Sequence, residues 1–263
     1  MILIASISRR ALRWRLAAAL TVLWAASFGG VAEAEEPKEA SNATATADAP
    51  AEPSESKIIP PALTEYMGRM IAPAMSYHGG GAGWLLRKLR EEEEKPSVLL
   101  PELRLKPGQT VCDLGCGNGY HVLMMAPLVE PGGTVIGVDI QQEMLDDLEK
   151  RAAQAGVTNV ETIRGEVHDP KLKPDLCDLI LLVDVYHEFS HPEPMLAAMR
   201  AALKPEGVVA LVEFRTEDPE VPIKPEHKMS KAQIKKEWEA NGFELAREFD
   251  ELPWQHLMFW KRK

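Results

Sequence analysis

Cysteine is scarce in this chain. Only three cysteines occur in 263 residues, and two of them, Cys112 and Cys116, lie inside one glycine-rich stretch, with Cys177 far away in the sequence. Three cysteines in that arrangement do not form a disulfide framework, even in an exported protein. No second cysteine pair and no Cys/His cluster completes a zinc site around them. We therefore expect no structural metal at the cysteines.

Two catalytic signatures are also missing. The glycine-rich stretch lacks the Lys-Ser/Thr pair that holds a triphosphate, and no Gly-x-Ser-x-Gly occurs in the chain, which excludes the serine elbow of the α/β-hydrolases. His78-Gly79-Gly80-Gly81 imitates the oxyanion loop of lipases, but that loop needs the missing serine. We interpret these glycines as a flexible joint. The functional alternative is a lid whose Tyr77 and His78 fold over a substrate.

Positive charge is in short supply after the first 34 residues. Four arginines at positions 9, 10, 13 and 15 precede an apolar run at 16–28, and Val-Ala-Glu-Ala at 31–34 offers a cleavage site. This pattern predicts a signal peptide over residues 1–34, cleaved after Ala34, and export to the periplasm or cell envelope. Cleavage would leave 26 basic and 39 acidic side chains, a net charge of −13. That charge disfavours nucleic acid as a partner.

The leader and the segment after it contribute no core. The apolar run is shorter than the about 20 residues of a membrane span, so we expect membrane contact only through an uncleaved leader. An internal start such as Met67 would instead leave the chain in the cytoplasm. Residues 35–57 are rich in Ala, Glu, Pro, Ser and Thr and have almost no large apolar side chains. This composition predicts a disordered linker.

Residues 58–104 carry a helical pattern. Met67, Met70, Ile71 and Met75 fall at helical spacing, and a second apolar group follows the glycines at Trp84. The pattern predicts an N-terminal helical cap over one end of the following domain.

From residue 105 onward, strand and helix patterns alternate. Apolar runs at 110–114, 134–138, 160–163, 179–183 and 208–214 predict strands, and the segments between them are helical. Such alternation predicts an α/β, doubly wound, mostly parallel sheet. The tail differs, because a helix at 230–240 with a Ser230/Gln233 capping box precedes two strand-like runs at 243–249 and 254–260. We expect these two runs to pair as an antiparallel hairpin.

The stretch Val-Cys-Asp-Leu-Gly-Cys-Gly-Asn-Gly at 111–119, followed by Val-Ile-Gly-Val-Asp at 135–139, is the most informative part of the chain. It predicts a strand, a glycine turn, a helix and a second strand that ends on an acid. Gly115 and Gly117 allow a sharp turn close to a ligand, and Gly119 allows the helix to pack tightly on the strand. Asp139 is placed to accept hydrogen bonds from ribose hydroxyls.

These residues resemble the first motifs of the class I S-adenosylmethionine-dependent methyltransferases of the type 11 or type 12 kind. The resemblance covers residues 105–263 and implies a Rossmann-like, seven-stranded sheet with the antiparallel C-terminal hairpin. It implies that Asp113 and the glycine backbone receive the methionine end of the cofactor, and that Glu166 and Val167 read adenine. The S-adenosyl-L-methionine site would comprise Asp113, Gly115, Cys116, Gly117, Gly119, Asp139, Ile140, Glu166, Val167 and Asp184.

A rival interpretation comes from His187-Glu188-Phe189-Ser190-His191, a complete His-Glu-x-x-His. On a helix this pattern binds zinc in metallopeptidases. Pro192 directly follows, however, and its ring would clash with the carbonyl of Glu188 in a helix. We interpret Ser190 as the cap of a helix that starts at Pro192, with Glu193 closing a capping box. We therefore expect no metal there.

Residues 184–188 follow the fourth strand at the edge where open α/β sheets bind ligands. The candidate catalytic residues are Asp184, Tyr186, His187 and Glu188, with His187 as a base that Asp184 or Glu188 orients. Arg215, Lys224, His227 and Lys228 are candidates for gripping an acidic substrate.

We therefore expect an exported methyltransferase that acts on a small-molecule acceptor, in an oligomeric state that the sequence does not define. A protein that binds the cofactor without catalysis is one alternative. A nicotinamide oxidoreductase is another, which the glycine spacing disfavours.

Overall fold

The computed structural model describes residues 59–263. The predicted signal peptide at 1–34 and the linker at 35–57 lie outside the described residues. Within the described range, no helix is long and apolar enough to cross a membrane.

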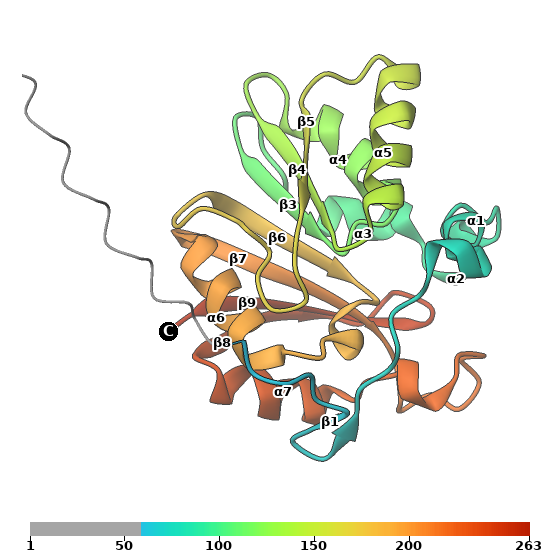
Figure 1. Cartoon of the computed structure of the whole chain (residues 1–263), viewed down its shortest axis with the longest axis vertical. Coiled ribbons are helices and arrows are strands. Elements are labelled where there is room, and N and C mark those ends of the chain that lie inside the picture. The colour runs from blue at the N-terminus through green and yellow to red at the C-terminus, as the bar shows by residue number, and fades with distance from the viewer. Residues whose placement is uncertain (1–58) are drawn as a thin grey trace, which may run out of the picture. The chain divides into compact units, whose positions relative to one another are not determined.

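One seven-stranded sheet organises the chain, in the order β5-β4-β3-β6-β7-β9-β8 (Figure 1). The strands β3 to β7 pair in parallel, and β9 pairs antiparallel with both β7 and β8. The predicted Rossmann-like sheet with an antiparallel C-terminal hairpin is confirmed. The strands are β3 (Thr110–Leu114), β4 (Thr134–Asp139), β5 (Val160–Arg164), β6 (Cys177–Val183), β7 (Leu203–Phe214), β8 (Phe243–Phe249) and β9 (Gln255–Arg262).

Helices cover both faces of the sheet, as Figure 1 shows. Side chains alternate along each strand, so Val111 enters the core on one face and Cys112 the core on the other. The core with Val111 packs against α3 (Pro96–Glu102), α4 (Tyr120–Val129) and α5 (Gln142–Ala155). The core with Cys112 packs against α6 (Pro192–Ala202) and α7 (Lys231–Ala240). Two-sided burial explains the continuous apolar run of β6.

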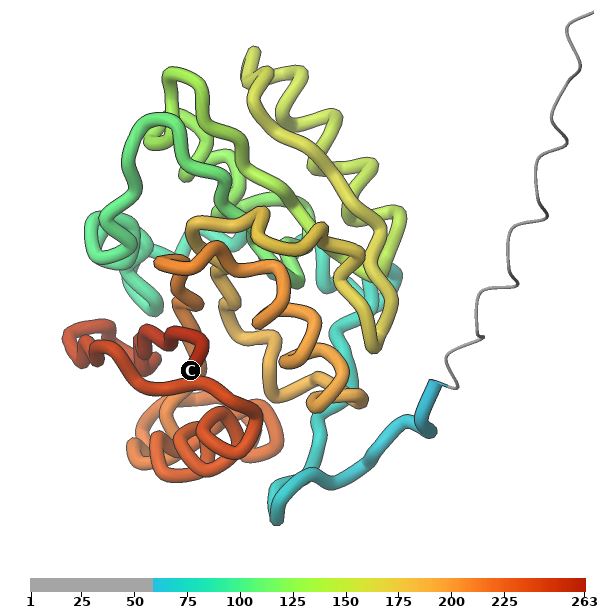
Figure 2. The backbone as a smooth tube through the Cα atoms, turned by 90° about the vertical axis from the view of Figure 1, so that its left-hand side faces the viewer, coloured from blue at the N-terminus to red at the C-terminus, as the bar shows by residue number. Residues whose placement is uncertain are grey.

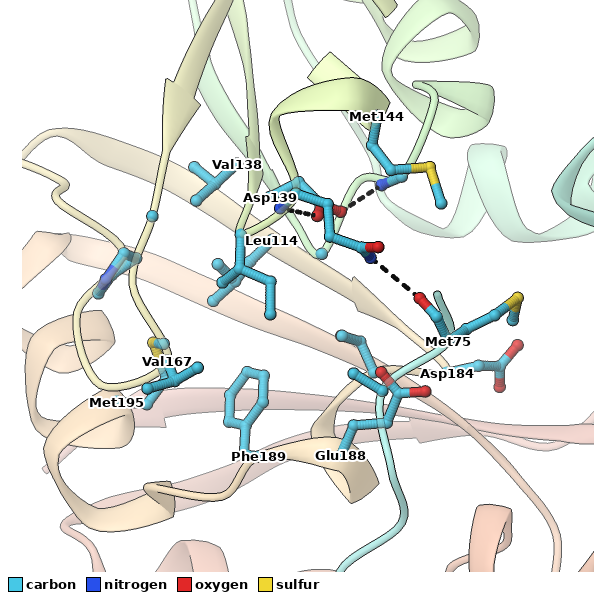
Figure 3. A pocket seen from close by; sticks show the side chains of 18 of the residues that line it. Met75, Leu114, Val138, Asp139, Met144, Val167, Asp184, Glu188, Phe189 and Met195 are labelled. Carbon is cyan, nitrogen blue, oxygen red and sulfur yellow. Dashed lines mark hydrogen bonds between the residues drawn. The ribbon is translucent and has the colours of Figure 1, made fainter. Parts of the chain in front are cut away.

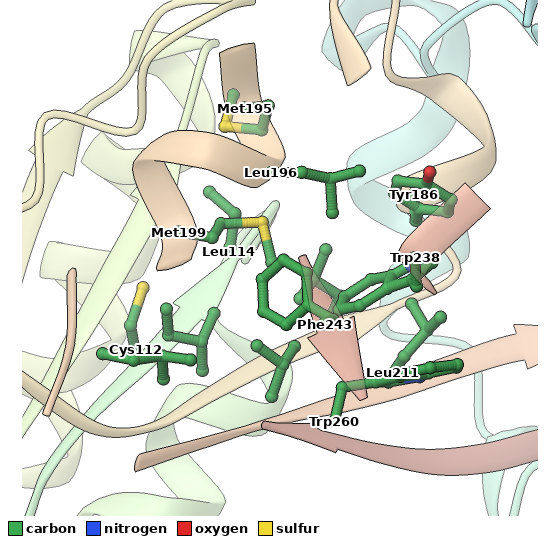
Figure 4. Packing of buried hydrophobic residues seen from close by; sticks show 14 of the residues in the cluster. Cys112, Leu114, Tyr186, Met195, Leu196, Met199, Leu211, Trp238, Phe243 and Trp260 are labelled. Carbon is green, nitrogen blue, oxygen red and sulfur yellow. The ribbon is translucent and has the colours of Figure 1, made fainter. Parts of the chain in front are cut away.

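Aromatic side chains fill the core beneath α7 (Figure 4). The rings of Trp238 and Trp260 stack with centroids 5.4 Å apart, and Phe243 lies against Trp238 at 4.9 Å. Tyr186 contacts the same indole edge-on at 5.4 Å. All four side chains are fully buried. The C-terminal helix and hairpin are therefore part of the main core.

The helical cap predicted at 58–104 is wrong for its first half. An extended arm occupies residues 59–76 (Figure 2). The arm contains a tight hairpin between β1 (Glu65–Tyr66) and β2 (Arg69–Met70). Met67 and Gly68 form the turn with φ of 49° and 97°, values that a right-handed helix cannot contain. The spacing of the methionines was a coincidence of an extended segment, and the methionine at 70 is exposed.

The second half of this region is helical in short pieces. They are the π-type turn η1 (Tyr77–Gly81), α1 (Ala82–Leu85), α2 (Arg90–Glu93) and α3. Backbone hydrogen bonds from Leu63 to Ser190 and from Ala72 to His187 tie the extended arm to the segment after β6. The arm therefore braces the loop that carries the candidate catalytic residues.

Two predicted helix starts have different outcomes. Ser230 caps α7 by accepting a hydrogen bond from the Gln233 amide at 3.1 Å, as predicted. The helix α6 begins at Pro192 as predicted, but its cap residue is His191 and no capping side chain bonds to it. The Ser190 hydroxyl instead pairs with Nδ1 of His191 at 2.9 Å. The predicted Ser190/Glu193 capping box is therefore wrong.

Candidate active site

A first cleft opens where β3, β4 and β6 end, at the point where the strand order reverses (Figure 3). The space inside it, open solvent included, is about 880 Å³. Of the predicted cofactor residues, seven line this cleft: Gly115, Gly117, Asp139, Ile140, Glu166, Val167 and Asp184. The remaining three, Asp113, Cys116 and Gly119, do not line it.

Asp139 organises the glycine turn. Its two carboxylate oxygens accept hydrogen bonds from the backbone N–H of Gly117 and of Gln141, each at 2.9 Å (Figure 3). Burial raises the pKa of Asp139, and these amide hydrogen bonds oppose that rise. The carboxylate thus joins the glycine turn to the start of α5 at the cleft wall.

Gly119 and Asp113 support the turn from behind. The backbone of Gly119 has φ of 78°, and a Cβ there would lie 2.2 Å from Cδ1 of Leu148 on α5. Asp113 is buried, and its Oδ2 has no hydrogen-bond partner among residues 59–263. Burial raises the pKa of Asp113 to about 7, with Arg90 opposing the shift and Asp139 adding to it. Asp113 is therefore a buried carboxyl group next to the cleft and not part of its lining.

Apolar side chains line two sides of the cleft. Leu114, Val138 and Met144 lie near Asp139, and Phe189 and Met195 lie across the cleft from them (Figure 3). We name these five side chains the apolar wall. Glu166 and Val167 lie at its open edge, where the Glu166 side chain is 50% exposed and forms an ion pair with Lys171 at 3.1 Å. An apolar slot with an acceptor at its rim suits a planar heterocycle that carries an amino group.

Residues 77–85, which we name the lid segment, lie beside the first cleft and reach it through Leu85. The Tyr77 amide donates to Oε1 of Gln141 at 2.8 Å, and its hydroxyl donates to Oδ2 of Asp147 at 3.0 Å. Leu85 lines the cleft and would meet a Cβ on Gly117 at 2.4 Å. The His78 side chain is 78% exposed. Tyr77 thus anchors the lid, whereas His78 points away from the cleft.

A second cleft of about 1180 Å³ adjoins the first. The two clefts share five lining residues: Met75, Leu85, Val183, Asp184 and Glu188. Asp184 has φ of 53°, and its backbone N–H donates to the carbonyl of Val212 at 2.9 Å. Its Oδ2 accepts from the Gln255 side chain at 2.6 Å, and its Oδ1 has no partner among residues 59–263. Burial raises the pKa of Asp184 well above its usual value, and this buried carboxyl group lies at the junction of the two clefts.

His187 lies on the floor of the second cleft, in the short helix η2 (Tyr186–Glu188). Its Nδ1 lies 2.6 Å from Oε2 of Glu213 on β7, and its Nε2 lies 3.0 Å from Nδ1 of His227 in η3 (Pro225–His227). Oε1 of Glu188 is 4.0 Å from the same Nε2. Glu213 orients the ring of His187, so the expected orienting role of Asp184 or Glu188 is wrong.

The pKa values of His187, Glu188 and His227 are shifted in different directions. Burial lowers the pKa of His187, but the Glu213 carboxylate outweighs it, and the net pKa is raised. Burial raises the pKa of Glu188 to about 7, and the neighbouring His187 opposes that rise. Burial and the charge of His187 both lower the pKa of His227. Neighbouring side chains with shifted pKa values in one cleft are typical of a functional site.

Some predicted residues lie outside both clefts. Tyr186 is fully buried and its hydroxyl donates to Oε2 of Glu237 at 2.7 Å, so it supports the core and does not face a substrate. The Arg215 guanidinium donates to backbone carbonyls, including that of Gln255, and Lys228 does the same at Val221. Of the four basic residues predicted to bind an acidic substrate, only Lys224 and His227 line the second cleft.

The two histidines of the His-Glu-x-x-His pattern do not share a helix face. His187 lies in η2, and His191 lies at the start of α6, where its Nε2 bonds to the carbonyl of Pro60 at 2.9 Å. The arrangement of a zinc metallopeptidase is therefore not formed by these residues.

A family model described as a methyltransferase domain matches residues 105–258. The chain belongs to this methyltransferase family. The match covers the whole seven-stranded sheet up to the middle of β9, and both clefts lie at the ends of its strands.

Curated relatives of this chain match parts of its length. Nocamycin O-methyltransferase of Saccharothrix syringae is 30% identical over 106 residues, which cover 40% of this chain and 38% of that protein. Demethylmenaquinone methyltransferase of Listeria monocytogenes is 28% identical over 135 residues, which cover 51% of this chain and 55% of that protein. The chain thus spans well under two thirds of the length of these curated relatives.

Solved structures show the same fold. A SAM-dependent methyltransferase from Aquifex aeolicus superposes with a TM-score of 0.65 at 25% identity, over 69% of this chain and 96% of that chain. A TehB-like methyltransferase from Corynebacterium glutamicum gives a TM-score of 0.54 at 16% identity, over 71% of this chain and 98% of that chain. Residues 1–104, which include the extended arm, lie outside the family match.

Sequence reasoning missed some residues of the candidate site. Glu213 is an acid that directly follows the apolar run at 208–212 of β7, and that contrast was the available signal. Met75 and Leu85, which line both clefts, come from the region interpreted as a helical cap. No local pattern reveals them, because the fold of the arm depends on distant contacts.

Proposed function

We propose that this protein is an S-adenosylmethionine-dependent methyltransferase that methylates a small molecule held in the second cleft. The observation that carries the proposal is the continuity of the two clefts through Asp184 and Glu188. The first cleft has the features of a nucleoside site, and the second brings titrating side chains to the shared junction.

The residues of the first cleft fit this cofactor. The glycine turn allows close approach of a ligand, Asp139 stands where ribose hydroxyls would be received, and the apolar wall suits adenine, with Glu166 at its rim. Asp184, which lines both clefts, would face the methionine part of the cofactor. When bound, S-adenosylmethionine supplies a methyl group already activated by a positive sulfur.

The chain's own contribution is positioning and desolvation. The lid and the apolar wall exclude water from the junction, which favours a displacement at a sulfonium carbon. Glu213 fixes the His187 ring with its Nε2 toward the second cleft, so an acceptor group there meets an oriented imidazole. Lys224 adds a positive charge to the same cleft, which suits an acceptor with an acidic group.

Calorimetric titration with S-adenosylhomocysteine tests the cofactor assignment. We expect micromolar binding at one site per chain and a loss of at least about tenfold in affinity in Asp139→Ala, because that carboxylate lines the cleft and holds the Gly117 amide. Asp146→Ala is the matched control, since Asp146 is exposed on α5 and lines neither cleft. A wild-type chain that binds no S-adenosylhomocysteine would overturn the proposal.

We also propose export of this methyltransferase, on the basis of the arginines and the cleavage pattern within residues 1–34. Fractionation of producing cells with N-terminal sequencing tests it. A mature chain that begins at Glu35 in the envelope fraction supports export, whereas a cytoplasmic chain that begins at Met1 or Met67 contradicts it.

A further inference from the structure

Three side chains with metal-binding atoms converge on the floor of the second cleft. His187, Glu188 and His227 each offer one ligand atom, and these atoms all lie within 4.8 Å of one another. We name these three residues the His-Glu-His cluster. Two short helices, η2 and η3, bring its members together from segments about 40 residues apart.

His187, at the centre of the cluster, is paired with a carboxylate, as metal-binding histidines often are. Nδ1 of His187 lies 2.6 Å from Oε2 of Glu213, which is fully buried. A carboxylate on one ring nitrogen fixes the tautomer and leaves the lone pair of the other nitrogen available to a cation. In this ring the available nitrogen is Nε2, the atom that faces the other two members of the cluster.

The spacing of the atoms suits a bound ion with small adjustments. Nε2 of His187 and Nδ1 of His227 are 3.0 Å apart. Two nitrogens at the zinc–nitrogen distance of about 2.0–2.1 Å are separated by about 3.0–3.4 Å, depending on the coordination geometry. The Glu188 oxygen, at 4.0 Å from Nε2, needs only a side-chain rotation to approach the same point.

We infer that the His-Glu-His cluster binds a divalent first-row transition-metal ion. Two imidazoles and one carboxylate form the donor set of catalytic zinc sites and of non-haem iron sites. Such a set leaves coordination positions open, and here the open side faces the second cleft.

The role of the ion in catalysis rests on the proposed methyl transfer, whereas its binding does not. An acceptor with an ionisable hydroxyl would coordinate at the open positions. A hydroxyl bound to such an ion is a stronger acid than a free one, so its proton passes to solvent at neutral pH. The ion would thereby hold the acceptor oxygen at the junction with the first cleft.

Cobalt titration tests the inference on the full chain. The purified protein is stripped with a chelator and titrated with Co²⁺, and uptake is read from the visible absorption of the bound ion and from elemental analysis. We expect one Co²⁺ per chain and displacement of cobalt by Zn²⁺. Glu213→Gln should weaken binding by about 10–100-fold, the usual effect of removing an outer carboxylate partner. His227→Ala should weaken it at least as much.

Controls separate this inference from the proposed function. His78→Ala removes an exposed histidine outside the cluster and should leave cobalt affinity unchanged. Circular dichroism and S-adenosylhomocysteine titration on the same samples show that each variant is folded. Cofactor binding without stoichiometric cobalt, or with cobalt affinity unchanged in His227→Ala, overturns the metal site and leaves the methyltransferase proposal standing. Cobalt binding without cofactor binding supports the metal site and overturns the methyltransferase proposal.

Discussion

The imidazole of His187 and the carboxylate of Glu213 form a buried pair, with Nδ1 and Oε2 2.6 Å apart. One partner comes from the segment after β6 and the other from the end of β7. Neither side chain has significant contact with solvent, so the attraction between them is weakly screened. This pair sets the charge state of the floor of the second cleft.

Replacing Glu213 by glutamine should lower the pKa of His187. Burial alone disfavours the imidazolium, and the net rise depends on the Glu213 charge. Because the folded-state pKa is raised, the pair stabilises the fold below the unfolded pKa of about 6.5, and this stabilisation is lost as pH rises through the folded pKa. NMR titration of the imidazole protons in metal-free protein measures the shift.

The control for this titration is Glu239→Gln, which removes an exposed acid on α7. It should leave the titration of His187 unchanged. An identical His187 pKa in the wild type and in Glu213→Gln would contradict the pairing.

Asp113 should make the stability of the cofactor-free protein fall with rising pH. Burial raises its pKa to about 7 in the folded chain, against about 3.9 in an unfolded one, so the folded state holds the proton longer. Stability is therefore lost between about pH 4 and pH 7. Asp113→Asn should remove this loss and raise the free energy of unfolding at pH 8 by about 1–3 kcal/mol.

Urea denaturation across this pH range measures the effect of Asp113. The exposed Asp146, replaced by asparagine, is the comparison and should keep the wild-type pH dependence. If the free energy of unfolding depends on pH in the same way in the wild type and in Asp113→Asn, the raised pKa of Asp113 is contradicted.

The strands and the glycine turn could be predicted because their signals are local. An apolar strand, a glycine pattern and an acid at 139 lie within 30 residues, and each constrains the next. The arm at 59–76 could not, because Met67 and Met70 have the spacing of a helix face while the turn at Gly68 is set by contacts with distant segments. One such contact is the hydrogen bond from the Gln233 side chain to the Met67 carbonyl at 3.2 Å.

The two clefts of the candidate site also differ in how well the sequence predicts them. Residues that line the first cleft follow strand ends, which the sequence marks, whereas the second cleft combines His187 with His227 across 40 positions. Tyr186 was predicted as a site residue because it is next to His187 in the sequence. In the structure His187 faces the second cleft and Tyr186 faces the core. A single turn of η2 sends adjacent side chains in opposite directions.

Tyr77→Phe should loosen the lid segment. The change removes only the hydroxyl that donates to Asp147, while the backbone bond from Tyr77 to Gln141 remains. We expect faster amide hydrogen exchange over residues 77–85, and partial recovery of protection when S-adenosylhomocysteine is bound, because Leu85 lines the first cleft. Tyr66→Phe, which removes a hydroxyl bonded to Asn241, is the control and should leave exchange in the lid unchanged.

Gly119→Ala should destabilise the fold far more than Gly156→Ala. Both glycines have positive φ, 78° and 68°, so each alanine carries a backbone cost of about 1–2 kcal/mol. At Gly119 the new Cβ also meets Leu148 at 2.2 Å, whereas at Gly156 it meets no atom within 4 Å. Overpacking adds about 1–3 kcal/mol at the first position only. Urea denaturation measures both variants, and equal losses of stability would mean that α5 shifts freely and that close packing of Gly119 on α5 does not hold the glycine turn in place.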